Sequence, residues 1–234
     1  AEKPTYRTWS EGGKSETRNP KSEVREAESV ASLNGAFGSA LSGGLVLDGD
    51  AEYHTLPFTI ECRAKLEGKE RYNILVACNP KSAGTHWELY THAKRGTLAL
   101  YLPGRGGDYD SGVDVCDGKW HNLVASVDQA LVTLWIDGKK VLEKPTGASE
   151  GLVRHANVES IAFGRLVEGG IGCDGILDDA RLSRGVMRPR PGNASRERMD
   201  NTLGLWNFDD LDALTGGAKA PVPAPFAPDP APLD

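Results

Sequence analysis

The chain has 234 residues, which suits one large all-β domain with extensions or two small domains. Its formal charge of −6 argues against nucleic acid as a main partner, because phosphate binding needs clustered Lys and Arg. No apolar run approaches the roughly 18–20 residues of a membrane-spanning helix, so we expect a protein that does not span a membrane. Apolar residues make up 39% of the chain, which indicates that part of it lies outside the core.

Composition divides the chain into three parts. Residues 1–30 are polar, of mixed charge and without periodicity, so we predict an extended N-terminal arm. Residues 31–212 carry the alternating segments of one domain. Residues 213–234 are rich in Pro and Ala, which favours a stiff polyproline-type arm or linker. We expect the two arms to hold a protein partner.

Short alternating segments follow one another through the middle of the chain, with turn signals between them. The segments expected as strands are 44–47, 58–66, 73–78, 87–92, 97–102, 120–127, 131–136, 160–164, 175–182 and 203–208. Asp137-Gly138 supplies the positive φ angles of a two-residue hairpin turn. Asp108–Asp114 lacks the Gly and Glu positions of an EF-hand loop, and we expect a solvated loop there. So many short strands predict an antiparallel sandwich or barrel and exclude an α/β fold.

Two polar residues are predicted to point into the sandwich. Alternation places His121 on the face of Leu123, and Asp178 on the face of Leu182. Buried polar groups need hydrogen-bond partners, so we expect His121 and Asp178 to pair. The pair is interpreted as structural and not as a catalytic dyad, because no nucleophile motif accompanies it.

The chain has four cysteines: Cys62, Cys78, Cys116 and Cys173. An even number permits two disulfides and an oxidising compartment, while buried free thiols are an equal alternative. Cys116 and Cys173 each precede a strand that carries one member of the predicted His121–Asp178 pair, which favours a bridge between them. Cys62 and Cys78 would form the second bridge if their Cα atoms lie within about 7 Å.

Outward-facing aromatic side chains are candidates for stacking on sugar rings. Trp135 is the first choice, because its neighbours Leu134 and Ile136 occupy the inner face of the strand. The other candidates for ligand binding are Trp87, Tyr90 and Tyr101.

Six segments in order resemble the laminin-G-like, concanavalin A-like jelly-roll domains of secreted bacterial proteins. They are Gly44–Tyr53, Phe58–Glu61, Gly118–His121, Leu134–Lys139, Gly175–Leu182 and Leu205–Asp209, and they span about residues 31–210. The resemblance implies two stacked antiparallel sheets and an extracytoplasmic (secreted or periplasmic) protein. It also makes bound Ca²⁺ an expectation, with Asp209 and Asp48 as candidate ligands.

The resemblance implies no single function, since members bind glycans or proteins or serve beside enzymes. We expect a non-catalytic recognition or accessory module for a protein partner or glycan, or a structural subunit held by its arms. The alternative is a carbohydrate-active enzyme of the same fold, a glycoside hydrolase or polysaccharide lyase. The alternating carboxylates of such hydrolases are missing from the sequence, and Tyr90 with His92 is the nearest approach to a lyase-like set.

Overall fold

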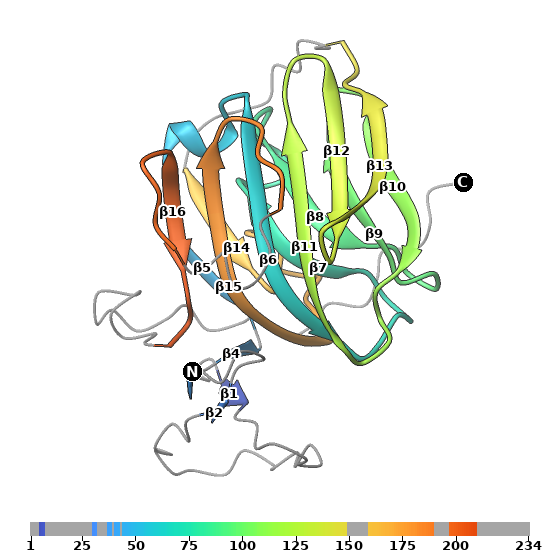
Figure 1. Cartoon of the computed structure of the whole chain (residues 1–234), viewed down its shortest axis with the longest axis vertical. Helices are drawn as coiled ribbons and strands as arrows, with labels where there is room; N and C mark the ends of the chain where they lie inside the picture. The colour runs from blue at the N-terminus through green and yellow to red at the C-terminus, as the bar shows by residue number, and fades with distance from the viewer. Residues whose placement is uncertain are drawn as a thin grey trace.

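The computed structural model describes residues 5–7, 30–31, 37–38, 40–42, 44–148, 159–189 and 197–209. These residues form two antiparallel sheets that face each other across one core, which confirms the predicted sandwich (Figure 1). The C-terminal arm at 213–234 lies outside the described residues. Of the predicted N-terminal arm, Thr5–Arg7 forms a strand, β1, that pairs with β4 (Ala40–Ser42).

The first sheet has eight strands. In spatial order they are β1, β4, β15 (Gly175–Arg184), β6 (Phe58–Leu66), β11 (Trp120–Val127), β12 (Leu131–Ile136) and β13 (Lys139–Pro145), with β16 (Thr202–Trp206) also paired to β15.

The second sheet has six strands. In spatial order they are β10 (Gly107–Asp114), β9 (Thr97–Leu102), β8 (Trp87–Thr91), β7 (Asn73–Cys78), β14 (Ser160–Phe163) and β5 (Leu45–Asp48). Two short strands, β2 (Val30–Ala31) and β3 (Phe37–Gly38), pair separately, and a 3-10 turn, η1, spans Ala51–His54.

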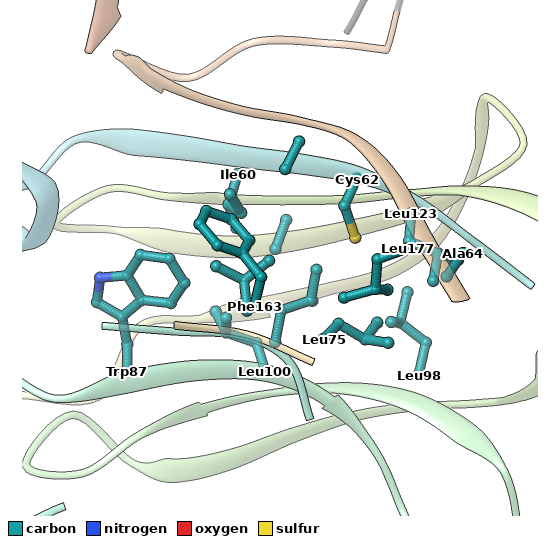
Figure 2. Close-up of a cluster of buried hydrophobic side chains, with 14 of the residues drawn as sticks. Ile60, Cys62, Ala64, Leu75, Trp87, Leu98, Leu100, Leu123, Phe163 and Leu177 are labelled. Atoms are coloured by element: carbon teal, nitrogen blue, oxygen red, sulfur yellow. The ribbon is translucent and has the colours of Figure 1, made fainter. Parts of the chain in front are cut away.

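The core fills the space between the sheets with side chains from alternate positions of each strand (Figure 2). Ile60 and Cys62 of β6 enter it from one sheet, and Leu75 of β7 and Leu100 of β9 from the other. Phe163 of β14 packs in the same layer, with its ring centroid 4.8 Å from that of Trp206 and 5.2 Å from that of Phe208.

The predicted hairpin turn is confirmed. Asp137 has φ 52° and Gly138 has φ 78°, the left-handed values that a type I′ turn needs. The turn joins Ile136 to Lys139, which face each other as the first pair of β12 and β13. Strand β13 was not predicted, and it extends the eight-stranded sheet by one strand.

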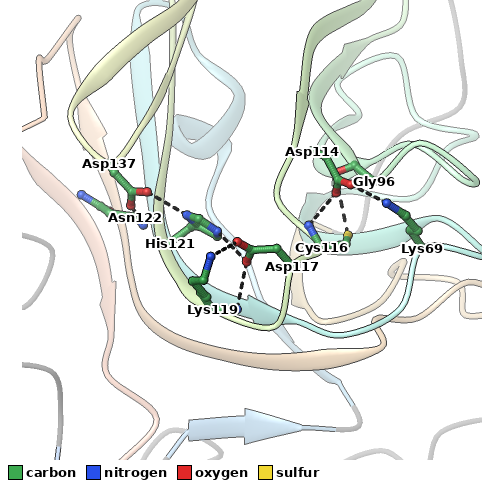
Figure 3. A network of polar contacts seen from close by, with 9 residues as sticks. All are labelled: Lys69, Gly96, Asp114, Cys116, Asp117, Lys119, His121, Asn122 and Asp137. Atoms are coloured by element: carbon green, nitrogen blue, oxygen red, sulfur yellow. Dashed lines mark hydrogen bonds and ion pairs between the residues drawn. The ribbon is translucent and has the colours of Figure 1, made fainter.

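His121 does not pair with Asp178, so that prediction is wrong. His121 stands opposite Ala64, as alternation requires, but this position lies at the end of the sheet (Figure 3). There its Nδ1 lies 2.7 Å from Asp137 Oδ2 and its Nε2 lies 3.0 Å from Asp117 Oδ1. Two carboxylates from neighbouring turns therefore hold the ring, and no partner inside the sandwich is needed.

Asp178 faces away from the core because β15 carries a bulge. Asp179 has φ 48°, and the register with β6 shifts between Asp178 and Arg181. Asp178 lies opposite the outward-facing Arg63, whose Nη1 is 3.0 Å from Asp179 Oδ2 and 3.9 Å from Asp178 Oδ2. The bulge returns Ala180 to the core, and so the alternation on which the prediction rested is interrupted.

The four cysteines are free thiols, so neither predicted disulfide is present. Cys62, Cys78 and Cys116 belong to the core, and Cys173 packs against it. Burial raises the pKa of all four thiols above the ordinary value, for Cys62 to about 12. The thiols are therefore protonated at neutral pH and behave as small apolar side chains.

Replacing Phe163 with Ala should strongly destabilise the fold. Phe163 is fully buried, and losing its ring removes apolar contacts and leaves a cavity beside Trp206 and Phe208. We expect the free energy of unfolding in urea to fall by about 3–5 kcal/mol. Val186→Ala, at a side chain that is 51% exposed, is the control and should change it little. Equal effects of the two substitutions would contradict the described core.

The contacts of His121 predict a pH-dependent contribution to stability. Burial acts to lower its pKa, but the hydrogen bonds to Asp137 and Asp117 outweigh burial and leave the pKa raised. The contribution should be complete below the unfolded-state pKa of about 6.5 and be lost as the pH rises through the folded-state pKa. The advantage of the wild type over His121→Asn in urea unfolding should thus be larger at pH 6 than at pH 9. A difference that does not change with pH would refute this role.

Candidate functional site

The outer face of the six-stranded sheet gathers polar and aromatic side chains. Along β8, Trp87 and Leu89 enter the core, so Glu88 and Tyr90 point to the opposite face. Tyr101 of β9 pairs with Glu88 in the ladder and shares this outer face. Two of the four predicted ligand-binding residues, Tyr90 and Tyr101, are thereby brought together.

A hydrogen-bonded group lies at the β8–β10 side of this face. The Tyr90 hydroxyl donates to Asp108 Oδ1 at 2.7 Å and lies 3.2 Å from His92 Nε2. His92 Nε2 lies 2.7 Å from Asp108 Oδ2, and Arg95 forms an ion pair of 2.6 Å with Asp110. The side chains of these residues are thus held in fixed positions before any ligand arrives.

Tyr72 adds an exposed aromatic ring to this group. Tyr72 comes directly before β7 in the chain, and it is 40% exposed. Its ring centroid lies 6.0 Å from that of Tyr90 and 6.1 Å from that of His92, which are themselves 5.1 Å apart. Three rings therefore stand together, one accessible from solvent and two more deeply placed.

A second polar group surrounds Tyr101. Lys81 Nζ lies 5.9 Å from the centroid of the Tyr101 ring and 3.3 Å from Glu88 Oε1. His86 donates from Nδ1 to the carbonyl of Asn79 at 2.8 Å, which directs its Nε2 toward Glu88 Oε2 at 3.6 Å. The charged side chains next to Tyr101 are therefore also fixed by mutual contacts.

The part of this face over β7 and β14 is apolar, and a following loop covers it. Ile74, Ala77 and Ala162 form its floor over β7 and β14, and Leu166 and Ile171 of the following loop pack on them. The polar part of the face therefore lies over β8, β9 and β10, where Glu88 and Tyr90 are buried and Tyr101 is half-buried.

The pKa of Tyr90 is raised well above its ordinary value, first by burial and then by its hydrogen bond to Asp108. The phenol thus stays protonated at neutral pH and donates a hydrogen bond. The arrangement suits the holding of a ligand by rings and hydrogen bonds, and it makes Tyr90 a poor general base.

The other two predicted aromatic residues lie elsewhere. Trp87 is a core residue: its ring stacks on Phe58 at 5.0 Å, and its Nε1 donates to the Tyr53 carbonyl at 3.0 Å. Its prediction as a ligand-binding side chain is wrong, because Trp87 shares the inner face with Leu89. Trp135 points outward as predicted, but on the eight-stranded sheet, and its side chain is largely buried.

Several residues of the site were not predicted from the sequence. The segment expected as a solvated loop is strand β10, and it places Asp108 opposite Tyr101 and Asp110 opposite Ala99. Tyr72 stands outside the alternating segments and gave no signal. Glu88, by contrast, has the same strand parity as Tyr90 and could have been inferred from it.

The candidate calcium ligands Asp48 and Asp209 are both exposed. Within the described part of the chain, no three His, Cys, Asp or Glu side chains gather closely enough to hold a metal ion. Ca²⁺ takes six to eight oxygen ligands, so the described neighbours of these aspartates do not complete a site. Calcium binding stays a prediction.

No helix among the described residues is long and apolar enough to cross a membrane. No curated protein matches the sequence. Solved structures with a similar fold are numerous.

One similar structure is that of a candidate carbohydrate-binding protein from Bacteroides ovatus, with 13% identity, a TM-score of 0.55, and coverage of 72% of this chain and 50% of that one. Domains LG4-5 of the mouse laminin alpha1 chain share 18% identity at a TM-score of 0.46, with coverage of 61% and 39%. The CBM40 of a Ruminococcus gnavus sialidase, bound to α2,3-sialyllactose, shares 15% identity at a TM-score of 0.49, with coverage of 62% and 86%.

The chain thus spans half or less of the length of the first two structures. Identities this low show the fold alone. The family is shown by a different comparison, in which a laminin-G-type family model matches residues 39–190. The matched region contains β4 to β15 and therefore most of both sheets. The chain belongs to the concanavalin A-like lectin/glucanase superfamily.

Proposed function

We propose that this protein is a non-catalytic glycan-binding module whose ligand lies over β8, β9 and β10. The observation that carries the proposal is the group formed by Tyr72, Tyr90 and His92, whose rings stand within about 6 Å of one another beside Asp108. Aromatic faces supply apolar contact area for the C–H groups of a sugar ring. Carboxylates and hydroxyls at the rim supply hydrogen bonds to its hydroxyl groups.

The charged groups of this face favour binding over turnover. Asp108 is held by Tyr90 and His92, Asp110 by Arg95, and Glu88 by Lys81. A glycosidase needs one carboxylic acid free to give its proton and a second carboxylate free to act as base or nucleophile. Carboxylates held in ion pairs are better suited to accept hydrogen bonds from sugar hydroxyls.

A glycan ligand fits an extracytoplasmic protein, because polysaccharides are the main glycans that a binding module meets outside the cytoplasm. Under this proposal the two terminal arms would attach the module to a protein partner or neighbouring domain. The sugar-binding face and the arms then have separate tasks.

Substitution of Tyr72 tests the proposal. A glycan array first identifies the best ligand, and calorimetric titration then compares the wild type with Tyr72→Ala and Tyr90→Phe. We expect Tyr72→Ala to weaken binding by about tenfold or more, because loss of a buried aromatic contact at a binding hot spot costs at least about 1–2 kcal/mol. Tyr90→Phe keeps the ring and removes only its hydrogen bond to Asp108, which His92 still holds, so it should weaken binding less.

Leu131→Ala is the matched control, since Leu131 has an exposure of 39% that resembles that of Tyr72 but lies on the eight-stranded sheet. It should leave the affinity unchanged. The proposal fails if no glycan binds the wild type, or if Tyr72→Ala binds as well as Leu131→Ala does. Hydrolysis or elimination of the bound polysaccharide would contradict the non-catalytic part.

A further inference from the structure

A separate pocket opens on the outer face of the eight-stranded sheet. It has a volume of about 330 Å³ and is lined by Trp135, Gly138, Lys140, Glu143, Arg188 and Pro189. This volume lies at the lower end of the roughly 300–1,000 Å³ range of small-molecule sites. The pocket therefore has room for a small group such as one or two sugar rings. It lies on the opposite sheet from Tyr72 and Tyr90, so it is distinct from the proposed glycan face.

The pocket is built by two segments that are distant in the sequence. Trp135 and Lys140 face each other as a pair in the ladder of β12 and β13. Arg188 and Pro189 arrive on the segment that leaves β15 and crosses β6 and β11. The backbone of Met187 fixes this segment, because its N–H donates to Thr59 Oγ1 and its carbonyl accepts from Ser126 Oγ, both at 2.9 Å. Arg188 is thereby anchored through its neighbour at the wall of the pocket.

The polar groups of the pocket offer more donors than acceptors. Glu143 is already engaged, since its Oε2 accepts from Lys140 Nζ at 2.8 Å. Within the described part of the chain, Arg188 forms no ion pair and the indole N–H of Trp135 has no hydrogen-bond acceptor. A guanidinium and an indole N–H thus have no partner among the described residues, and both can donate to a ligand; Arg188 is exposed at the mouth of the pocket. The guanidinium presents the planar fork that matches a carboxylate.

We propose that this pocket binds a carboxylated sugar, a uronic acid residue of an acidic polysaccharide. The carboxylate pairs with Arg188, and the sugar ring lies between the apolar walls that Trp135 and Pro189 provide. The ring hydroxyls donate to the remaining oxygen of Glu143. An acidic peptide could satisfy the charge of Arg188, but it would make less use of two flat apolar walls around a small cavity.

The test is calorimetric titration of the full chain with tetragalacturonate and with its methyl ester, which keeps the rings but lacks the charge. We expect the wild type to bind the acid form at least tenfold more tightly than the ester, and less tightly as salt is raised. Arg188→Gln should weaken binding of the acid form by about tenfold to hundredfold, which is the loss expected for a hydrogen-bonded charge pair. Arg188→Lys should retain part of the affinity, because it keeps the charge without the fork.

Arg184→Gln is the control, since Arg184 is an exposed arginine at the end of β15 that pairs with Glu52 outside the pocket. It should bind tetragalacturonate as the wild type does. The inference is overturned if tetragalacturonate and its ester bind equally, if neither binds, if Arg188→Gln behaves like Arg184→Gln, or if hexaglutamate binds as tightly. Tyr72→Ala should leave this binding intact, so failure here and failure of the glycan face are separate results.

Discussion

Packing of the two sheets against each other decides what the protein can present to solvent. Each strand gives alternate side chains to the shared core, and the residues between them are forced outward. In β8 the core takes Trp87 and Leu89, so Glu88 and Tyr90 must face away from it. The same rule puts Trp135 outside, because Leu134 and Ile136 lie inside. Both candidate binding regions therefore follow from how the core is filled.

The two outer faces are organised differently. On the six-stranded sheet, Tyr90, His92 and Asp108 are joined by direct side-chain contacts between β8 and β10. On the eight-stranded sheet, Thr59 and Ser126 fix the backbone of the segment that carries Arg188. In each case the contacts that shape the surface are internal to the protein. Such preorganisation lowers the entropy cost of ligand binding.

Most strands of the sandwich could be predicted because alternation is a local property of the sequence, but β10 and β13 were missed. Asp137-Gly138 could be predicted for the same reason, since its turn depends on two adjacent residues. The outward orientation of Asp178 could not be predicted, because the bulge at Asp179 is set by pairing with β6 and leaves no local signal. His121 followed the alternation, but its partners Asp117 and Asp137 depend on where the sheet ends. Trp87 could have been excluded as a ligand-binding residue. It lies three positions before Tyr90 on the same strand, and an odd separation places two residues on opposite faces.

The proposed glycan ligand lies over β8, β9 and β10 on the outer face of the six-stranded sheet. A crystal structure of the protein with its best oligosaccharide ligand tests this most directly. We expect a sugar ring against Tyr72, with its hydroxyls hydrogen-bonded to Asp108 or its neighbours. An oligosaccharide bound elsewhere, with this face in contact with solvent alone, would contradict it.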